Sequence, residues 1–334
     1  MEFLIEFGLF LAKSLTVLLV ALVLVTAVVN AMRSTRQHDQ LPARLEVRHL
    51  NDEYRQASLT MKAAMLPAKA LKTEKKALKA ARKQHGDSDK PRLFVLDFHG
   101  DIRASATESL REEITAVLTV AEDKDEVLVR LESGGGMIPA YGLAAAQLLR
   151  LRERGLRLTV AVDRVAASGG YMMACIADRI LVAPFAIVGS IGVIAQLPNF
   201  NRMLKKHDID FEQFMAGEHK RTVTLFGENT DQGRQKFQQE IEQAHRLFKD
   251  FVGRYRPQID LNEVATGEYW YGTQAMAHNL ADQVLTSDEF LLESSEKTEL
   301  YLVSKKVRKP LLSRLLPGTG DALNRLSNTN VLRL

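Results

Sequence analysis

The segment Leu156–Pro184, LRLTVAVDRVAASGGYMMACIADRILVAP, decides the fold class. Its first part, Leu156–Val162, is rich in Val and Leu and predicts a buried strand, and Arg179–Pro184 has the same character. Between them, SGGYMMACIAD (168–178) predicts a short apolar helix that follows a serine and two glycines. Two strands joined through a helix pair in parallel. The segment therefore predicts an α/β fold.

The same alternation runs upstream of this segment. The stretch SATESLREEITAVLTVA (105–121) starts with a capping box of Ser105 and Glu108 and continues with the apolar spacing of a helix. Strands that alternate with helices favour a mostly parallel sheet, in which ligands bind at loops beyond the carboxyl ends of the strands. The further elements expected are strands at Leu93–Phe98 and Glu126–Ser133 and a helix at 139–155.

The composition fits a globular domain of ordinary chemistry. The chain has 334 residues, of which 46% are hydrophobic and 26% charged, and its formal net charge is +4. This supplies enough apolar material for a core. The single cysteine, Cys175, excludes an internal disulfide and a metal site made of several cysteines. The glycine triplet 134–136 matches neither a P-loop nor a dinucleotide-binding fingerprint, and we expect no metal and no bound cofactor.

The N-terminal region is different in character. Ser14–Met32 carries no charge over 19 residues, and a helix of that length spans about 28 Å, close to the hydrocarbon thickness of a bilayer. A cleaved signal peptide fits less well, because Glu2 and Glu6 replace the basic residues that usually precede its apolar part. We therefore expect a retained transmembrane helix.

A basic stretch follows the apolar run. KTEKKALKAARKQ (Lys72–Gln84) favours helix, and its charge suits either a solvated helix face or attraction to anionic lipid headgroups. Nucleic-acid binding is not expected, because the stretch lacks interleaved aromatic residues. The expected organisation is a membrane anchor at 1–34, a basic helical linker at 35–90, a catalytic domain at 91–300 and a basic tail at 301–334.

Two loops at the carboxyl ends of predicted strands are candidates for chemistry. In Ser133–Gly136 the glycines let the backbone N–H groups approach a ligand, as an oxyanion hole requires, although an ordinary turn explains them equally. In Ala166–Gly170, Ser168 is either the N-cap of the following helix or a nucleophile. Ala166 stands where a G-x-S-x-G nucleophile elbow has its first glycine, so that motif is absent.

A nucleophilic serine needs a base. The chain has eight histidines, but none lies in a triad context, and only His99 and His219 fall in loops of interest. A lysine can take this role when loss of water favours its neutral amine. Lys220, in FMAGEHKRT, is a candidate, although by itself it is more typical of a surface charge.

Taken together, the segments resemble a known family. AASGGYMMACIADRILVAPFAIVGSIGV (166–193), followed by MAGEHKRT (215–222), resembles the signal peptide peptidase family of serine–lysine membrane proteases, and the resemblance covers about residues 91–285. It implies the crotonase/Clp protease-like fold. One departure is Gly134, where the family often has proline. The roles implied are nucleophile for Ser168, general base for Lys220, orientation of that lysine for Ser190, and an oxyanion hole of Gly134, Gly135 and Gly169.

The resemblance also implies a function. It indicates a serine endopeptidase with a Ser-Lys dyad that hydrolyses peptides or protein and signal-peptide fragments at the bacterial inner membrane. Family members form oligomers that enclose a shared groove, so we expect a homo-oligomer, a lipid bilayer and peptide substrates as partners. Small residues around Ser168 imply a groove for small or aliphatic side chains. Two alternatives remain, an inactive scaffold with the same fold and an acyl-CoA enzyme of the wider crotonase-like group.

The sequence gives conflicting indications of the side of the membrane on which the catalytic domain lies. Arg33, Arg36, Arg44 and Arg48 follow the apolar run, against Lys13 before it. The positive-inside rule then places the catalytic domain in the cytoplasm. The family resemblance places it on the outer face of the inner membrane. We take the periplasmic side as the expectation.

Overall fold

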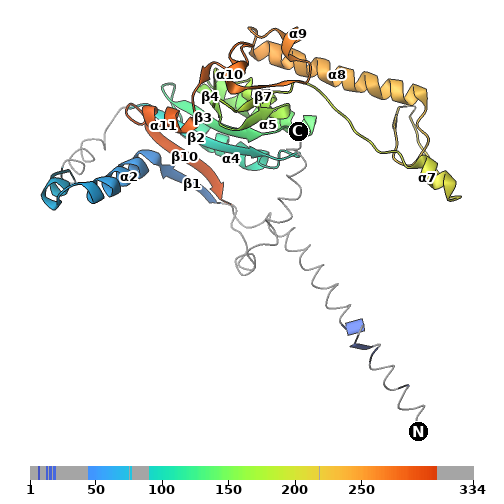
Figure 1. Cartoon of the computed structure of the whole chain (residues 1–334), viewed down its shortest axis with the longest axis horizontal. Coiled ribbons are helices and arrows are strands. Elements are labelled where there is room, and N and C mark those ends of the chain that lie inside the picture. The colour runs from blue at the N-terminus through green and yellow to red at the C-terminus, as the bar shows by residue number, and fades with distance from the viewer. Residues whose placement is uncertain are drawn as a thin grey trace. The chain divides into compact units, whose positions relative to one another are not determined.

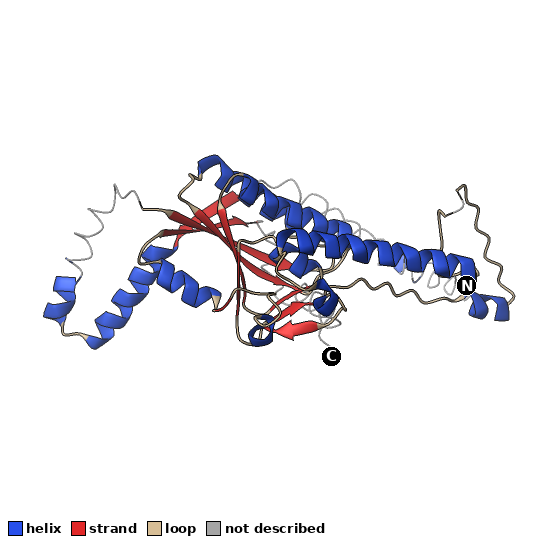
Figure 2. Cartoon of the chain, turned by 90° about the horizontal axis from the view of Figure 1, so that it is seen from above, coloured by secondary structure: helices blue, strands red, loops and turns tan. Residues whose placement is uncertain are grey.

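The structure, a computed structural model, describes residues 44–74, 76, 90–217 and 219–306, and the isolated residues 7, 13, 15, 16, 18 and 19. Within these residues the fold is a 10-stranded sheet covered by helices (Figures 1 and 2). No helix in this part of the chain has the length and apolar character needed to cross a membrane. The anchor predicted at 1–34 lies almost entirely outside the described residues, so it stays a prediction.

The predicted parallel α/β architecture is confirmed. Each neighbouring strand pair from β10 to β9 is parallel, as expected when helices connect the strands. In spatial order the main sheet contains β1 (Arg44–His49), β10 (Glu299–Lys306), β2 (Arg92–Gly100), β3 (Glu126–Ser133), β4 (Arg157–Val162), β6 (Arg179–Val182) and β9 (Gln283–Val284).

A short branch leaves this sheet at the carboxyl end of β3. The strand β5 (Val165–Ala167) joins β3 through the pair Ser133↔Ala166. It also pairs in parallel with β7 (Ile187–Gly189), which in turn pairs antiparallel with β8 (Tyr269–Tyr271). The branch therefore holds the loop after β3 beside the loops after β5 and β7.

Both faces of the sheet are buried. In β2, Phe94, Leu96 and Phe98 belong to one apolar core, while Leu93 and Val95 belong to the other, as the alternation of side chains along a strand requires. The first core contains residues of α4 (Thr107–Val120), α5 (Ile138–Glu153), α6 (Gly169–Ala174) and α8 (Asp231–Tyr255), and the second those of α2 (Leu50–Met65) and α11 (Ser287–Ser294). Three shorter helices are α7 (Asn201–Lys206), α9 (Leu261–Val264) and α10 (Gly272–Ala275), and residues 68–74 are helical as well.

The structure differs from the sequence-based expectations at element ends. The capping box does not form, because the Ser105 backbone N–H and hydroxyl both donate to the Asp101 carboxylate and α4 begins only at Thr107. The strand β1 lies inside the stretch expected as a helical linker, and β10 continues past residue 300, where the domain was expected to end. Since β1 is an edge strand with mostly exposed side chains, it lacks the continuous apolar run of a buried strand.

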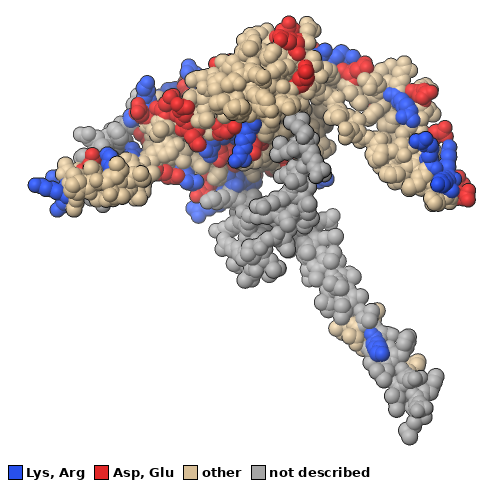
Figure 3. All heavy atoms as spheres, viewed as in Figure 1, with Lys and Arg blue, Asp and Glu red and all other residues tan. Residues whose placement is uncertain are grey.

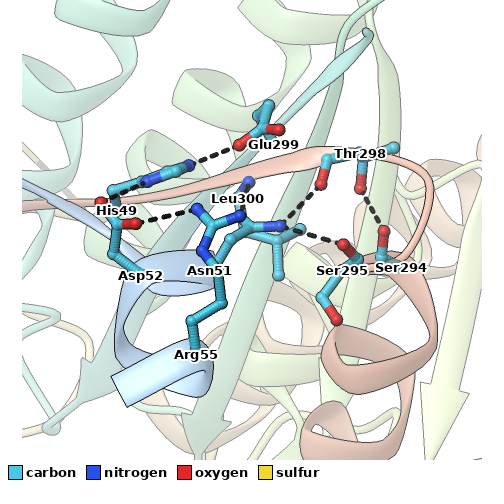
Figure 4. A network of polar contacts seen from close by, with 9 residues as sticks. All are labelled: His49, Asn51, Asp52, Arg55, Ser294, Ser295, Thr298, Glu299 and Leu300. Carbon is cyan, nitrogen blue, oxygen red and sulfur yellow. Dashed lines mark hydrogen bonds and ion pairs between the residues drawn. The ribbon is translucent and has the colours of Figure 1, made fainter. Parts of the chain in front are cut away.

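A buried asparagine attaches the β1–α2 segment to the sheet. The amide nitrogen of Asn51 donates to the carbonyls of Ser295 and Thr298, both at 3.0 Å, and its oxygen accepts the Leu300 N–H at 2.7 Å (Figure 4). The Asn51 side chain is thereby bonded to the turn that connects α11 to β10. Buried polar groups of this kind are costly to leave without a partner.

We expect Asn51→Asp to lower the free energy of unfolding by about 2–4 kcal/mol, because a carboxylate cannot donate to the two carbonyls. Gln56→Glu makes the same amide-to-acid change at an exposed position of α2 and should alter stability by less than about 0.5 kcal/mol. Urea unfolding of both variants measures the difference. Equal losses in the two variants would show that the Asn51 contacts are not stabilising.

Candidate active site

Two predicted site serines stand side by side in the branch of the sheet. Ala167 in β5 and Gly189 in β7 are register partners, so Ser168 and Ser190 directly follow paired positions. Strands in a sheet lie about 5 Å apart, and the Ser168 N–H donates to the Gly189 carbonyl at 2.8 Å. Both serines have a positive φ, +52° and +51°. This backbone region is uncommon for residues other than glycine and is often found at functional sites.

The hydroxyl of Ser168 is not used to cap the following helix. Ser168 occupies the N-cap position of α6, with φ 52° and ψ −118°, but its side chain makes no capping hydrogen bond. Only its carbonyl serves the helix, by accepting the Met172 N–H at 3.0 Å. The interpretation of Ser168 as a simple helix cap is therefore not supported, and its half-buried side chain is available for chemistry.

The glycine loop after β3 lies against Ser168. Gly135 has φ +87°, and a Cβ atom there would stand 2.7 Å from the Gly169 nitrogen and 2.8 Å from the Ser168 Cβ. At Gly169 a Cβ would stand 2.4 Å from Cγ of Tyr141. Distances this short exclude larger residues unless the backbone moves. Only glycine at both positions permits the loop to approach the serine so closely.

The Gly135 N–H already has an acceptor within the chain. It donates to the Ser133 hydroxyl at 3.0 Å. The oxyanion hole predicted from the family resemblance contains Gly134, Gly135 and Gly169. Gly135 lies against Ser168 and Gly169, and Gly134 lines the cavity described below. The Gly135 N–H would have to leave Ser133 in order to reach a substrate oxygen.

A cavity of about 480 Å³ opens beside these residues. Its walls include Ser190, Gly134 and Gly135, and the small or aliphatic residues Val165, Ala167 and Ile187. Its lining also includes His99, Gly100, Asp101, Ile102, Glu132, Ser133 and Tyr269.

Charged side chains at one side of the cavity pair with each other. Glu132 lies 3.7 Å from the His99 ring nitrogen Nδ1 and 3.3 Å from Arg164 Nη1. The sequence analysis did not single out Glu132 or Tyr269. For Glu132 a signal existed, since it stands immediately before the Ser-Gly-Gly-Gly loop.

Lys220 lies on the segment between β7 and α8, residues 192–230, which we call the arm. The arm is held by its own contacts, such as the Phe200 N–H to the Leu225 carbonyl at 2.7 Å and the Asn199 side chain to the Thr224 carbonyl at 2.9 Å. Figures 1 and 2 show it extending away from the sheet. The Lys220 side chain is exposed and does not line the described cavity.

Other nucleophile and metal chemistries find no support in the described part of the chain. Cys175 is fully buried, and this burial raises the pKa of its thiol far above the usual range, so it stays protonated and unreactive. No group of three or more His, Cys, Asp or Glu residues with the geometry of a metal site occurs among the described residues.

We expect Gly135→Ala to lower the free energy of unfolding by about 1–3 kcal/mol, because the residue would be strained and would press on its neighbours. It should also slow the labelling of Ser168 by a fluorophosphonate. Gly142→Ala is the matched control, since a Cβ at Gly142 in α5 meets no atom within 4 Å, and it should raise stability by up to about 1 kcal/mol. Unfolding curves and labelling rates distinguish the two variants, and wild-type behaviour of Gly135→Ala would refute the close approach of the loop.

Comparisons with known proteins bear on this site. The family model described as peptidase family S49 N-terminal matches residues 2–148, and that described as peptidase family S49 matches residues 150–301. A protein named "Probable protease SohB" from Haemophilus influenzae is 47% identical over 331 residues, which cover 94% of this chain and 92% of that protein. A protein of the same name from Buchnera aphidicola is 52% identical over 242 residues, 72% of this chain and 71% of that protein. "Protease 4" of Haemophilus influenzae is 27% identical over 183 residues, 53% of this chain and 30% of that protein.

Proposed function

Because this chain belongs to peptidase family S49, we propose that it is a serine endopeptidase with a Ser-Lys dyad formed by Ser168 and Lys220. The observation that carries the proposal is the state of Ser168. Its backbone is held at φ 52°, its hydroxyl makes no capping bond, and it lies against Gly135. Ser168 itself does not line the described cavity, but Gly135 and Ala167, the residue before Ser168, do. A side chain in this setting suits a nucleophile better than a structural role.

The structure of the single chain does not bring Lys220 to Ser168, so the roles in the proposed reaction are taken from the family resemblance. The neutral amine of Lys220 accepts the Ser168 proton while Oγ attacks a peptide carbonyl, and backbone N–H groups of Gly134 and Gly169 stabilise the oxyanion. Loss of one such donor typically costs about 10²–10³ in rate. The lysine then gives its proton to the leaving amine, which frees one product and leaves an acyl-enzyme. Lys220, neutral again, then deprotonates a water that attacks the acyl-enzyme. The second product is released, and the lysine returns the proton to the Ser168 oxygen. Ser190 orients the lysine by a hydrogen bond.

This mechanism requires a dry environment for Lys220, and a second copy of the chain would provide it. In the single chain Lys220 is exposed, and apolar side chains on the same arm are exposed too, with fractions of 79% for Ile194, 90% for Phe214 and 51% for Met215. Exposed apolar surface of this kind typically marks an interface. We therefore propose a homo-oligomer in which the arm is covered and Lys220 is carried into a cavity.

The cavity suits peptides with small or aliphatic side chains. Ala167, Val165 and Ile187 form its apolar wall, and the glycine backbone leaves space beside them. Over the described part of the face shown in Figure 3, Lys and Arg are interspersed with Asp and Glu, so this face does not favour a nucleic acid. We propose peptides or protein fragments as substrates. The uncharged run Ser14–Met32 supports anchoring of the enzyme in the bacterial inner membrane.

We expect Ser168→Ala and Lys220→Ala each to lower peptide hydrolysis by at least about 10³-fold, because each removes a reacting group. Lys205→Ala is the matched control, since Lys205 is an exposed arm lysine paired with Glu228 at 3.0 Å, and it should keep near wild-type turnover. The assay uses the full chain in detergent with labelled casein, and a fluorophosphonate reports on Ser168. Normal turnover by Lys220→Ala would exclude it as the base. A wild-type chain that neither cleaves nor reacts would support the scaffold alternative.

We expect Phe214→Glu to shift the full chain toward monomers and to reduce hydrolysis, because a charge on the arm opposes its burial. Leu292→Glu is the control, since Leu292 is also exposed, at 61%, but lies on α11. Light scattering of the detergent-solubilised protein gives the mass, and casein cleavage gives the activity. An unchanged mass and activity for Phe214→Glu would contradict the role of the arm in assembly.

A further inference from the structure

A buried tyrosine connects the loops that form the candidate active site. Tyr141 lies near the start of α5 and has no exposed surface. Its hydroxyl donates to the Asp101 carbonyl at 2.7 Å, in the loop after β2, and lies 2.5 Å from the Ser133 hydroxyl at the end of β3. Because the single Tyr141 proton goes to Asp101, the Ser133 hydroxyl must be the donor to Tyr141.

The chain of hydrogen bonds continues to the glycine loop. Ser133, which is 1% exposed, gives its own proton to Tyr141 and accepts the Gly135 N–H at 3.0 Å. Three bonds therefore run in one direction, from Gly135 through Ser133 and Tyr141 to the carbonyl of Asp101. Ser133 and Tyr141 are buried and Gly135 is half-buried, whereas Asp101 at the end of the chain of bonds is exposed. The two hydroxyls therefore have little access to solvent as an alternative partner.

The tyrosine ring also packs against Gly169, the residue that follows Ser168. A Cβ at Gly169 would stand 2.4 Å from Cγ of Tyr141, and a Cβ at Gly100 would stand 2.5 Å from its hydroxyl oxygen. Tyr141 thus contacts the loop after β2, the last residue of β3 and the start of α6. Gly135, at the other end of the chain of bonds, lies against Ser168.

We propose that Tyr141 is a positioning residue for the protease site, which through Ser133 fixes the glycine loop beside Ser168 so that its backbone N–H groups face the tetrahedral intermediate. The inference rests on the proposed function. Burial raises the pKa of the Tyr141 hydroxyl, so it remains a neutral donor over the working pH range. Neither Tyr141 nor Ser133 touches the substrate in this scheme.

The structure supplies a matched control for this tyrosine. Tyr171, on α6, is equally buried, and its hydroxyl donates to the Leu280 carbonyl at 3.0 Å, away from the glycine loop. Tyr141→Phe and Tyr171→Phe each remove one buried hydroxyl and keep the ring. The full chain in detergent is compared with both variants in urea unfolding, in fluorophosphonate labelling of Ser168 and in hydrolysis of a fluorogenic peptide.

We expect the two variants to lose similar stability but to differ in catalysis. Tyr141→Phe should lower kcat and the labelling rate by about 10–100-fold, a smaller effect than the loss of a whole oxyanion donor. KM should change less than about twofold, because binding of the substrate in its ground state is untouched. Tyr171→Phe should leave kcat within about twofold of the wild type. Equal effects of the two variants on kcat, or a change confined to KM, would overturn the proposal.

A second variant tests whether the groups act as one unit. Ser133→Ala removes the central hydroxyl and should lower kcat to the same extent as Tyr141→Phe, and the double variant should be no slower than the slower single one. Fully additive losses would show that the two hydroxyls act separately. If Tyr141→Phe does not fold, Ser133→Ala alone still tests the positioning role, because it breaks the same chain of hydrogen bonds.

Amide hydrogen exchange of the glycine loop keeps this inference separate from the proposed function. Residues 134–136 should exchange about 10-fold faster in Tyr141→Phe than in Tyr171→Phe, because the Ser133 hydroxyl that accepts the Gly135 N–H is no longer held by Tyr141. Unchanged exchange would refute the positioning role even in an active enzyme. Faster exchange in a chain that hydrolyses no peptide would uphold the positioning role and reject the proposed protease function instead.

Discussion

The pairing of β5 with both β3 and β7 is the constraint on which the candidate site depends. It places Ser168 and Ser190 directly after register partners, and it brings the glycine loop after β3 to the same point. Both serines have a positive φ. A residue other than glycine in this backbone region costs about 1–3 kcal/mol and persists only where its surroundings hold it. Here the Ser168 N–H donates to Gly189, and the Ser190 N–H donates to Glu268 at 2.6 Å. The short branch of the sheet therefore fixes the backbone of both serines.

The sequence predicts the central strands well and the branch poorly. The strands β2, β3 and β4 are buried on both faces, so each shows a continuous apolar run that periodicity can detect. By contrast β5 and β7 have three residues each, which is too short for any pattern to appear. Their existence follows from pairing partners that are distant in sequence, and only the folded chain shows these.

The candidate site likewise contains some residues that the sequence indicates and others that it does not. Local sequence marks Ser168 and the glycines as candidates, because they fall in loops at the carboxyl ends of predicted parallel strands, where ligands bind. A helix cap and an ordinary turn explain these residues too, and their roles, like those of Lys220 and Ser190, come from family resemblance. Tyr141 escapes sequence analysis because it occupies an apolar position of a helix and resembles an ordinary core residue. Its importance lies in what its hydroxyl meets, the Ser133 hydroxyl and the Asp101 carbonyl, and no spacing rule reveals such a contact.

The location of the proposed base has a consequence for control of the enzyme. Ser168, the glycine loop and the cavity all belong to the sheet and its branch, whereas Lys220 is on an exposed arm. In the single chain Lys220 is not part of the described cavity, so this site lacks its proposed base. Under the proposed mechanism, burial of the arm supplies the base and the assembly in the same event. Proteolysis would then be confined to the assembled enzyme, and a newly made single chain would be harmless to its surroundings.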